Sequence, residues 1–191
     1  MRILGFDTAT SACSVALWQS GAVVARRFEP MARGQSERLM PMIREVLDEA
    51  GTGFADLDLL AVTRGPGAFT GLRIGLAAAR GLALATGLPC LGVTTLDALA
   101  CAVPAEEIAG RTLLAVIDAK RADLYAQAFG AGLTPLGPPA ALLPEALPSL
   151  LDGAKGPLVI VGDGIGRALG PLRVAGIEVV ESRALGVPDA A

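Results

Sequence analysis

Asp7, Thr8 and Thr10 are the first residues of the chain whose types and spacing could do chemistry, because they form a short polar segment after an apolar run. Residues 2–6 read RILGF, and the next four read Asp-Thr-Ala-Thr. Small and hydroxyl residues in a turn let backbone N–H groups point at an anion, so these three residues are candidates for a vestigial phosphate-binding loop. The alternative is a hairpin turn whose Asp and Thr side chains bond only to the turn's own backbone.

A second candidate is the glycine-rich segment 64–71, RGPGAFTG, which lies between a predicted strand and a predicted helix. This position suits anion binding at a helix N-terminus, with Arg64 and Arg73 adding positive charge. The spacing differs from the dinucleotide fingerprint, and no Gly-Lys-Ser/Thr follows, so the segment is not a P-loop. Thr70 is expected to cap the helix. The alternative is a tight turn that packs the strand closely on the helix.

The chain contains no histidine, and this absence narrows the chemistry further. Histidine-based metal sites and Ser-His-Asp or Cys-His catalytic units are excluded. The carboxylate pairs Asp118 with Asp123 and Glu106 with Glu107 are weak candidates for acid–base work, because most such groups lie on surfaces or in turns. We therefore expect neither a catalytic residue nor a resident metal in this chain.

The composition favours a partner-binding protein over a binder of nucleic acid or membrane. Hydrophobic residues make up 52% of the chain and charged residues 18%, which is more apolar than an average domain and suggests a buried subunit interface. A net charge of −3 argues against autonomous binding of tRNA or DNA. No segment reaches about 18 uncharged apolar residues, so no membrane span is expected. The cysteines show no C-x-x-C spacing, which fits reduced thiols in a cytoplasm.

One local series of arginines departs from the net negative charge of the chain. A solvated face of mixed ion pairs is the simpler interpretation, and a supporting contact to RNA inside a complex is the alternative. The series and its interspersed carboxylates are Arg26, Arg27, Glu29, Arg33, Glu37, Arg38, Arg44 and Glu45.

Two predicted helices, residues 36–50 and 71–86, carry the surface that we expect to bind a partner. In the first helix, apolar residues recur at helical spacing, Ser36 is the expected N-cap and Gly51 the stop. The second helix is apolar nearly all round, so more than one of its sides must be covered. Its small residues recur every four positions and form a strip that another helix could approach, unless the helix is buried entirely within the monomer. The expected interface residues are Leu39, Met40, Met42, Ile43, Leu72, Arg73, Gly75, Leu76 and Ala79.

The two halves of the chain begin alike, which predicts two related lobes, residues 1–103 and 104–191. In each half an apolar strand ends at an aspartate, Asp7 or Asp118, and a returning strand follows. The predicted strands are 2–6, 12–18, 22–28, 58–63, 89–93, 112–117, 123–129, 157–161 and 176–181. The first half has the β-β-β-α-β-α order of an RNase H-like lobe. The expected fold class is therefore α/β, a two-lobed actin-like ATPase architecture with mixed sheets and a reduced second lobe.

The residues quoted so far resemble the TsaB family, also called YeaZ. The resemblance is carried by the start, ILGFDTATSACSVAL, and by the run RGPGAFTGLRIGLAAARGLALATGLPCLGVTTLDALA, and more loosely by AVIDAKRADLYAQAF in the second half. The match is strong over the first 100 residues and looser over 112–165. The C-terminal helix and Pro-x-Tyr-Leu-Arg-like ending usual in the family are not matched by the last residues, so the second lobe is expected to lack that helix.

The resemblance implies a subunit of the tRNA threonylcarbamoyladenosine machinery. In that family a paralogue, TsaD, carries the metal and transfers the threonylcarbamoyl group to N6 of adenosine 37 in tRNAs that read ANN codons. TsaB-like proteins pair with TsaD through the helices that correspond to 36–50 and 71–86, and a small ATPase, TsaE, joins them. The resemblance further implies a homodimer when the protein is alone, tRNA contact only through the complex, no tightly bound cofactor, ATP or ADP at a subunit interface, and a cytoplasmic location.

Three functions are thus compatible with the sequence. The leading expectation is a non-catalytic scaffold that activates TsaD. The second is an ATP-dependent acyltransferase or peptidase-like enzyme in its own right. The third is a nucleotide-binding module without turnover, for which Asp7, Thr8 and Thr10 would be the contact residues.

Overall fold

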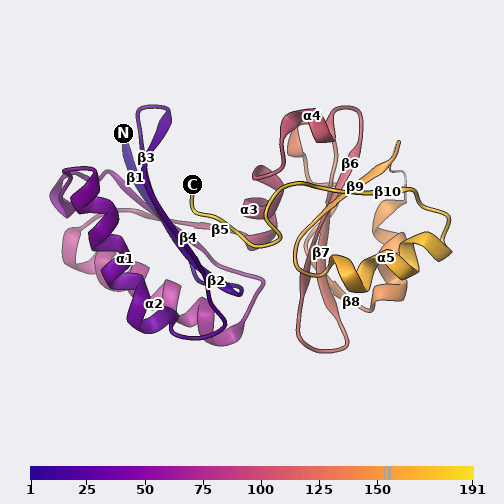
Figure 1. The fold of residues 1–191 in the computed structure, drawn as a ribbon, viewed down its shortest axis with the longest axis horizontal. Helices are drawn as coiled ribbons and strands as arrows, with labels where there is room; N and C mark the ends of the chain where they lie inside the picture. Colours follow the sequence, from indigo (N-terminus) through magenta and orange to yellow (C-terminus); the bar gives the residue numbers. More distant parts are fainter. Residues whose placement is uncertain (153, 155) are drawn as a thin grey trace. The chain divides into compact units, whose positions relative to one another are not determined.

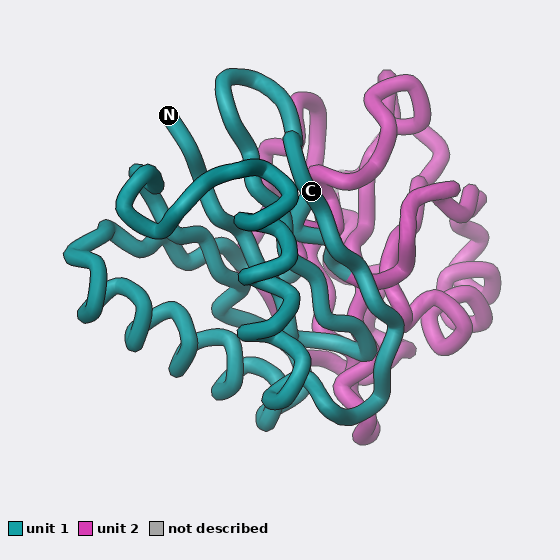
Figure 2. Tube along the Cα trace, turned by 60° about the vertical axis from the view of Figure 1, so that its left-hand side comes forward, with its two compact units in different colours: residues 1–95, 188–191 teal, residues 96–187 magenta. Residues whose placement is uncertain are grey.

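The computed structural model describes residues 1–152, 154 and 156–191 of the chain. These residues form two compact units, one of Met1–Thr95 with Pro188–Ala191 and one of Leu96–Val187 (Figure 2). The chain passes from the first unit to the second between Thr95 and Leu96, whereas the sequence placed the boundary between residues 103 and 104. Within the described ranges, no helix is both long and apolar enough to cross a membrane.

The first unit is a five-stranded sheet of order β3-β2-β1-β4-β5 with two long helices. Strands β1, β2 and β3 are antiparallel, whereas β4 pairs parallel with both β1 and β5. Parallel neighbours need a crossover, and α1 and α2 supply the two crossovers. Its elements are β1 (Arg2–Asp7), β2 (Ala12–Gln19), β3 (Ala22–Pro30), α1 (Gln35–Glu49), the 3-10 turn η1 (Phe54–Asp56), β4 (Leu59–Thr63), α2 (Phe69–Thr86) and β5 (Cys90–Val93).

The turn between β2 and β3 confirms the hairpin predicted from its two residues. Ser20 and Gly21 both have positive φ, 51° and 99°. Two consecutive left-handed residues give the turn whose twist matches that of paired strands, and a glycine adopts this conformation at little cost.

Both long helices cover the same face of the first sheet, α1 over β2 and β3 and α2 over β4 and β5 (Figure 1). Strand side chains alternate, so Leu4 and Phe6 of β1 join the helices in one core. Asp7 lies on the other side of the pleat from Phe6, at the end of its strand.

The two expected helix caps are wrong. Gly34, with φ 100°, precedes α1, and Ser36 lies inside the first turn. Ala68 precedes α2, so Thr70 is the second residue of the helix and caps nothing. In both cases the loop geometry before the helix, and not a hydroxyl side chain, sets where the helix begins.

The second unit repeats the topology of the first. Its sheet has the order β10-β9-β6-β7-β8, with β6 antiparallel to β7 and parallel to β9, as β1 is to β2 and β4. Its edge strands are only three residues long, and β8 is not among the strands predicted from the sequence. The elements are α3 (Thr95–Cys101), α4 (Ala105–Ile108), β6 (Thr112–Asp118), β7 (Leu124–Phe129), η2 (Ala131–Leu133), β8 (Ala140–Leu142), η3 (Pro144–Leu151), β9 (Leu158–Val161), α5 (Ile165–Val174) and β10 (Val179–Glu181).

The segment Pro188–Ala191 returns to the first unit and is fixed on its sheet. The Asp189 carboxylate forms an ion pair with Arg26 of β3. The Ala190 N–H donates to Ser14 Oγ of β2 at 3.1 Å, and Ser14 is fully buried. Residues far away in the sequence therefore pack on β2 and β3 of the first sheet.

Candidate functional site

The turn after β1 holds the Asp7 carboxyl inside the fold, at the carboxyl ends of β1 and β4. Asp7 is 1% exposed, and its Oδ1 accepts hydrogen bonds from Thr63 Oγ1 at 2.5 Å and from the Ala9 N–H at 3.1 Å. In the part of the chain that the structure describes, Asp7 Oδ2 and Thr10 Oγ1 are buried without a hydrogen-bond partner. The carboxyl ends of parallel strands are where ligands bind in open α/β sheets, so this turn remains the candidate for a ligand contact.

Burial sets the charge state of this carboxyl. Desolvation raises the pKa of Asp7 from 3.8 to about 6, although the hydrogen bonds from Thr63 and Ala9 act to lower it. The nearby Asp189 carboxylate raises it further. The turn thus presents a weakly acidic, acceptor-rich group that repels anions when it is ionised.

The Thr8 side chain bonds to the backbone of α2. Its Oγ1 donates to the Gly71 carbonyl oxygen at 2.7 Å. A Cβ at Gly71 would overlap the Thr8 carbonyl oxygen, and a Cβ at Gly67 would overlap that of Ala9. The glycines of the 64–71 segment are therefore required for the turn to pack on the start of α2, which is the tight-turn interpretation of that segment.

The two arginines that were expected to add positive charge at this turn contact other residues. The Arg73 guanidinium lies over the Phe69 ring, 3.6 Å from its centroid, and the Arg64 side chain runs along Gly92 of β5. The Ala9 N–H is taken by Asp7, and the Ala68 N–H donates to the Ala9 carbonyl oxygen. The groups of this turn therefore do not fit a tightly held phosphate, although Asp7 and Thr10 keep oxygens for a contact supplied by another molecule.

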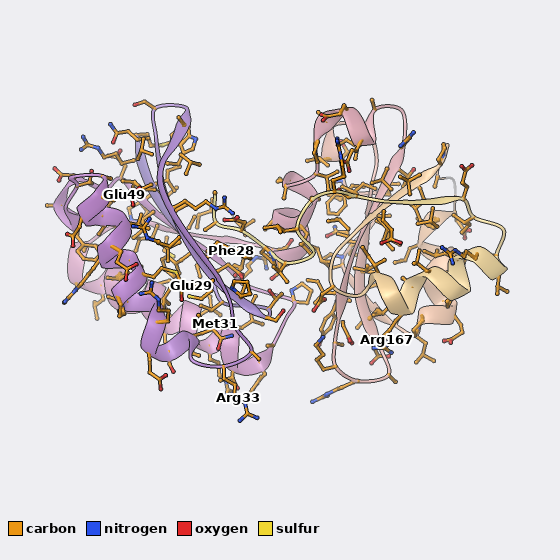
Figure 3. The ribbon with its side chains drawn as sticks, viewed as in Figure 1. Phe28, Glu29, Met31, Arg33, Glu49 and Arg167 are labelled. Carbon is orange, nitrogen blue, oxygen red and sulfur yellow. The ribbon has the colours of Figure 1, made fainter. Side chains whose placement is uncertain are left out.

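The second unit carries the same turn with a different electrostatic outcome. Asp118 Oδ1 accepts the Lys120 N–H at 2.8 Å, as Asp7 accepts that of Ala9. Its carboxylate also pairs with the Lys120 ammonium and the Arg167 guanidinium, the latter on α5 (Figure 3). Burial acts to raise the pKa of Asp118, but these bonds together hold it below its usual value. Among the described residues, no group of three or more Cys, Asp or Glu side chains could hold a metal ion.

The α1 residues predicted for a partner interface are mostly core residues. Leu39, Met42 and Ile43 are each at most 1% exposed, so these three residues lie in the core of the unit and not on a free surface. Met40 is 38% exposed and is the member of this set that α1 presents to solvent. The burial follows from helical spacing, because residues 39, 42, 43 and 46 share the side that faces β2 and β3.

The small-residue strip of α2 faces the chain's own sheet. Gly71, Gly75 and Ala79 are buried, and a Cβ at Gly75 would contact Thr8 and Val62. The expectation that a partner helix approaches this strip was wrong, because the sheet already occupies it. Leu72 and Leu76 are half-buried beside the strip.

The opposite side of α2 is exposed, and we call it the outer face. Phe69 is 68% exposed and Leu84 is 89% exposed, although both are large apolar side chains. A second strip of small residues, Ala77, Gly81 and Ala85, runs along this side. Sequence reasoning missed it, although the spacing 69, 73, 76, 80 and 84 marks one helical side. The outer face comprises Phe69, Arg73, Ala77, Arg80, Gly81, Leu84 and Ala85.

Comparison with known proteins adds three results. A family model described as TsaD: tRNA N6-adenosine threonylcarbamoyltransferase matches residues 29–137, more than half of the chain. The chain is 48% identical over 125 residues to the tRNA threonylcarbamoyladenosine biosynthesis protein TsaB of Escherichia coli (strain K12), which covers 65% of this chain and 53% of that protein. The chain spans about half the length of the curated relatives it matches.

Solved structures agree with the sequence relatives. The crystal structure of an uncharacterized protein with similarity to peptidase YEAZ from Pseudomonas aeruginosa superposes with a TM-score of 0.86 at 34% identity, over 99% of this chain and 86% of that one. The ROK hexokinase from Thermus thermophilus superposes with a TM-score of 0.55 at 15% identity, over 96% of this chain and 93% of that one, a likeness of fold alone. The expected α/β fold class, with its actin-like ATPase architecture and mixed sheets, is confirmed.

Proposed function

Because the chain belongs to the TsaB (YeaZ) family, we propose that it is a non-catalytic, activating subunit of the complex that forms N6-threonylcarbamoyladenosine at position 37 of ANN-decoding tRNAs. It pairs with a TsaD-like paralogue through α1 and α2, and a TsaE-like ATPase joins the pair. The tRNA binds to the complex and not to this chain alone, since the net charge of the chain is −3.

The single observation that carries this function is the apolar outer face of α2. Phe69 and Leu84 are 68% and 89% exposed on the same side of α2, and an exposed apolar surface that is contiguous marks an interaction site. Ala77 and Gly81 between them leave room for another helix to approach closely, and no atom lies within 4 Å of a Cβ built at Gly81. These features support a helical partner at this face.

The non-catalytic role is supported by the hydrogen bonds and ion pairs that the polar side chains of the two turns already make. Thr8 bonds to α2, and Asp118 is neutralised by Lys120 and Arg167. Asp7 and Thr10 keep one unbonded oxygen each. A nucleotide at a subunit interface would therefore take its phosphate contacts from the partner, while Asp7 and Thr10 contribute hydrogen-bonding oxygens at the edge of such a site.

The test is reconstitution of the tRNA modification from purified subunits, with and without this chain. The variant Leu84→Glu places a carboxylate on the outer face and should abolish stimulation, because it would put a charge in an apolar contact and would draw Arg80, one turn away, from the partner. The matched control is Val174→Glu on α5, which alters a side chain that is 91% exposed on another helix. It should stimulate like the wild type.

Three outcomes would contradict the proposal. The first is full tRNA modification in the absence of this chain. The second is turnover of ATP or peptide by this chain alone, at a rate that persists after removal of every other subunit and is lost in Asp7→Asn. Loss of stimulation in both glutamate variants would equally contradict a role for the outer face.

A further inference from the structure

The segment 188–191, which we call the strap, crosses the side of the first sheet that faces away from α1 and α2. Paired strand residues point to the same side, so Asp7 of β1 shares its side with Ser14, its partner in β2. The Ala190 N–H donates to Ser14 Oγ at 3.1 Å. A Cβ built at Gly5, two residues before Asp7 and on the same side, would lie 3.3 Å from the Ala190 carbonyl oxygen. The strap therefore lies directly on β1 and β2 beside the Asp7 carboxyl.

An ion pair fixes the strap to the third strand of the same sheet. The Asp189 carboxylate pairs with the Arg26 guanidinium of β3, and the Asp189 side chain is only 12% exposed. Pro188, the residue before it, is buried. A short segment that is held by one ion pair, one hydrogen bond and a few packing contacts can open locally at a lower cost than the sheet beneath it.

The carboxylate that holds the strap is an unfavourable neighbour for Asp7. Asp7 is 1% exposed, and the nearby charge of Asp189 adds to burial in raising the pKa of Asp7. Since the closed strap brings this charge close to Asp7, the ionised form of Asp7 must in turn disfavour the closed strap. The other side chains of the elements that pack against this turn are uncharged hydroxyls, or arginines that contact other residues, namely Thr10, Ser14, Thr63, Arg64 and Arg73.

We propose that the strap is a pH-sensitive closure over Asp7, which stays on the sheet while the Asp7 carboxyl is protonated and opens when that carboxyl ionises beside Asp189. The native pKa of Asp7 is about 6, so the closed strap is favoured below this pH and opening increases as the pH rises through it. Opening would present Asp7 Oδ2, which is buried without a hydrogen-bond partner among the described residues, to a donor on another molecule. The device is independent of the proposed function, because it consists of contacts within the first unit.

The test is amide hydrogen exchange of the purified chain at pH 5 and pH 8, with each rate divided by that of an unstructured peptide at the same pH. The protection of the Ala190 amide should fall about tenfold between the two pH values, which corresponds to a coupling of about one pKa unit. The amides of β4 should stay better protected than the strap at both pH values, because the strap opens without the sheet. Asp7→Asn cannot ionise, so its strap should be equally protected at both. The exposed Asp48→Asn on α1 is the matched control and should follow the wild type.

Two further variants separate the contacts that close the strap from the group that opens it. Arg26→Gln removes the ion pair, and Gly5→Val fills the space beside the Ala190 carbonyl, so both should lower the protection of the strap at both pH values. With the strap open, Asp7 is better solvated and farther from Asp189. A carboxyl ¹³C NMR titration of Gly5→Val should therefore show Asp7 ionising at a lower pH than in the wild type.

Three results would overturn the inference, and none of them bears on the proposed function. The first is equal protection of the wild-type strap at pH 5 and pH 8, or a pH dependence that persists in Asp7→Asn. The second is a strap no less protected than β4, since it would then open only with the whole unit. The third is an unchanged titration of Asp7 in a Gly5→Val variant whose strap has lost its protection.

Discussion

Thr63 Oγ1 donates a hydrogen bond of 2.5 Å to Asp7 Oδ1, which joins the carboxyl ends of β4 and β1 inside the fold. The Ala9 N–H shares the same acceptor, so one carboxyl oxygen is fully used while the other is buried without a partner. The carboxyl thus gains two hydrogen bonds, which lower its pKa, but loses the solvation of its charge, which raises it. The loss of solvation has the larger effect on the pKa.

Asp7 should make the protein less stable as the pH rises. The native pKa of about 6 lies above the unfolded value near 3.8, so the native state binds more protons between these pH values. The contribution of Asp7 to the free energy of unfolding is therefore most favourable below the unfolded pKa. About 3 kcal/mol of it is lost as the pH rises through about 6. Urea unfolding of wild type and Asp7→Asn from pH 4 to 8 checks this.

The asparagine keeps the Oδ1 acceptor for Thr63 and Ala9 and cannot ionise. Asp7→Asn should therefore be the more stable protein at pH 8, and its advantage should shrink towards pH 4. The exposed Asp48→Asn on α1 is the control and should follow the wild type. A variant less stable than wild type at every pH would contradict the assignment of the raised pKa to Asp7.

Two glycines of one helix should respond oppositely to alanine. A Cβ at Gly71 would overlap the backbone carbonyl of Thr8, which cannot move without shifting the turn, whereas a Cβ at Gly81 meets no atom within 4 Å. Gly71→Ala should cost at least about 2 kcal/mol, as overpacking does. Gly81→Ala should add about 0.5–1 kcal/mol through helix propensity. Thermal and urea unfolding would show the difference, and equal effects would contradict the assignment of the two helix sides.

The Arg38 network should stabilise the packing of α1 on β3 in a salt-dependent way. Arg38 bonds Glu29 of β3 and Glu45 of α1, while Arg27 reaches Glu45 and Glu49. Arg38→Met should lower stability by about 1 kcal/mol at low salt and by less at high salt. The exposed Arg33→Met, which removes a charge outside the network, should change stability little.

The same network predicts a pH dependence opposite to that of Asp7. Hydrogen bonds from Arg38 hold the pKa of Glu29 and of Glu45 below 4.5. Their contribution is therefore present above the unfolded pKa and is lost as the pH falls through the lower native values. Wild type and Arg38→Met should differ in stability at pH 6 and converge in acid. A constant difference across this range would show that Arg38 acts through packing alone.

The three cysteines should differ in their reactivity towards an alkylating reagent. Cys13 is fully buried, and burial raises the pKa of its thiol to about 11, whereas Cys90 and Cys101 are exposed. Since the thiolate is the reacting species, iodoacetamide at pH 8 should alkylate Cys90 and Cys101 in the native protein and Cys13 only after unfolding. Peptide mass spectrometry measures the three sites, and rapid labelling of Cys13 in the native protein would contradict its place in the core.

Elements with a strong local pattern could be predicted from the sequence. The hairpin at Ser20 and Gly21, the two long helices and the parallel strands all form where the pattern of apolar residues and turn residues placed them. The repeat of an aspartate at the end of each first strand correctly indicated two related lobes, since Asp7 and Asp118 make the same bond to the backbone two residues on. The three-residue strand β8 carries too little pattern to be recognised.

The site was harder to predict because a helix has two sides and the sequence does not say which side meets the sheet. In α2 both sides carry small residues every four positions, Gly71 with Gly75 and Ala77 with Gly81. Only the packing of Gly71 and Gly75 on Thr8 shows which strip is buried. The outer face, with Phe69 and Leu84, is the side that remains exposed, and of its residues only Arg73 was predicted for an interface.

The return of residues 188–191 to the first sheet has a consequence for synthesis on the ribosome. The second unit is one continuous stretch of chain, so it can finish folding as soon as it has emerged. The first unit is interrupted by that stretch, and its Ser14 and Arg26 must wait for Ala190 and Asp189, which are made after the whole second unit. The unit that is translated first is therefore the last to gain all of its contacts, although the five strands of its sheet are all made by residue 93.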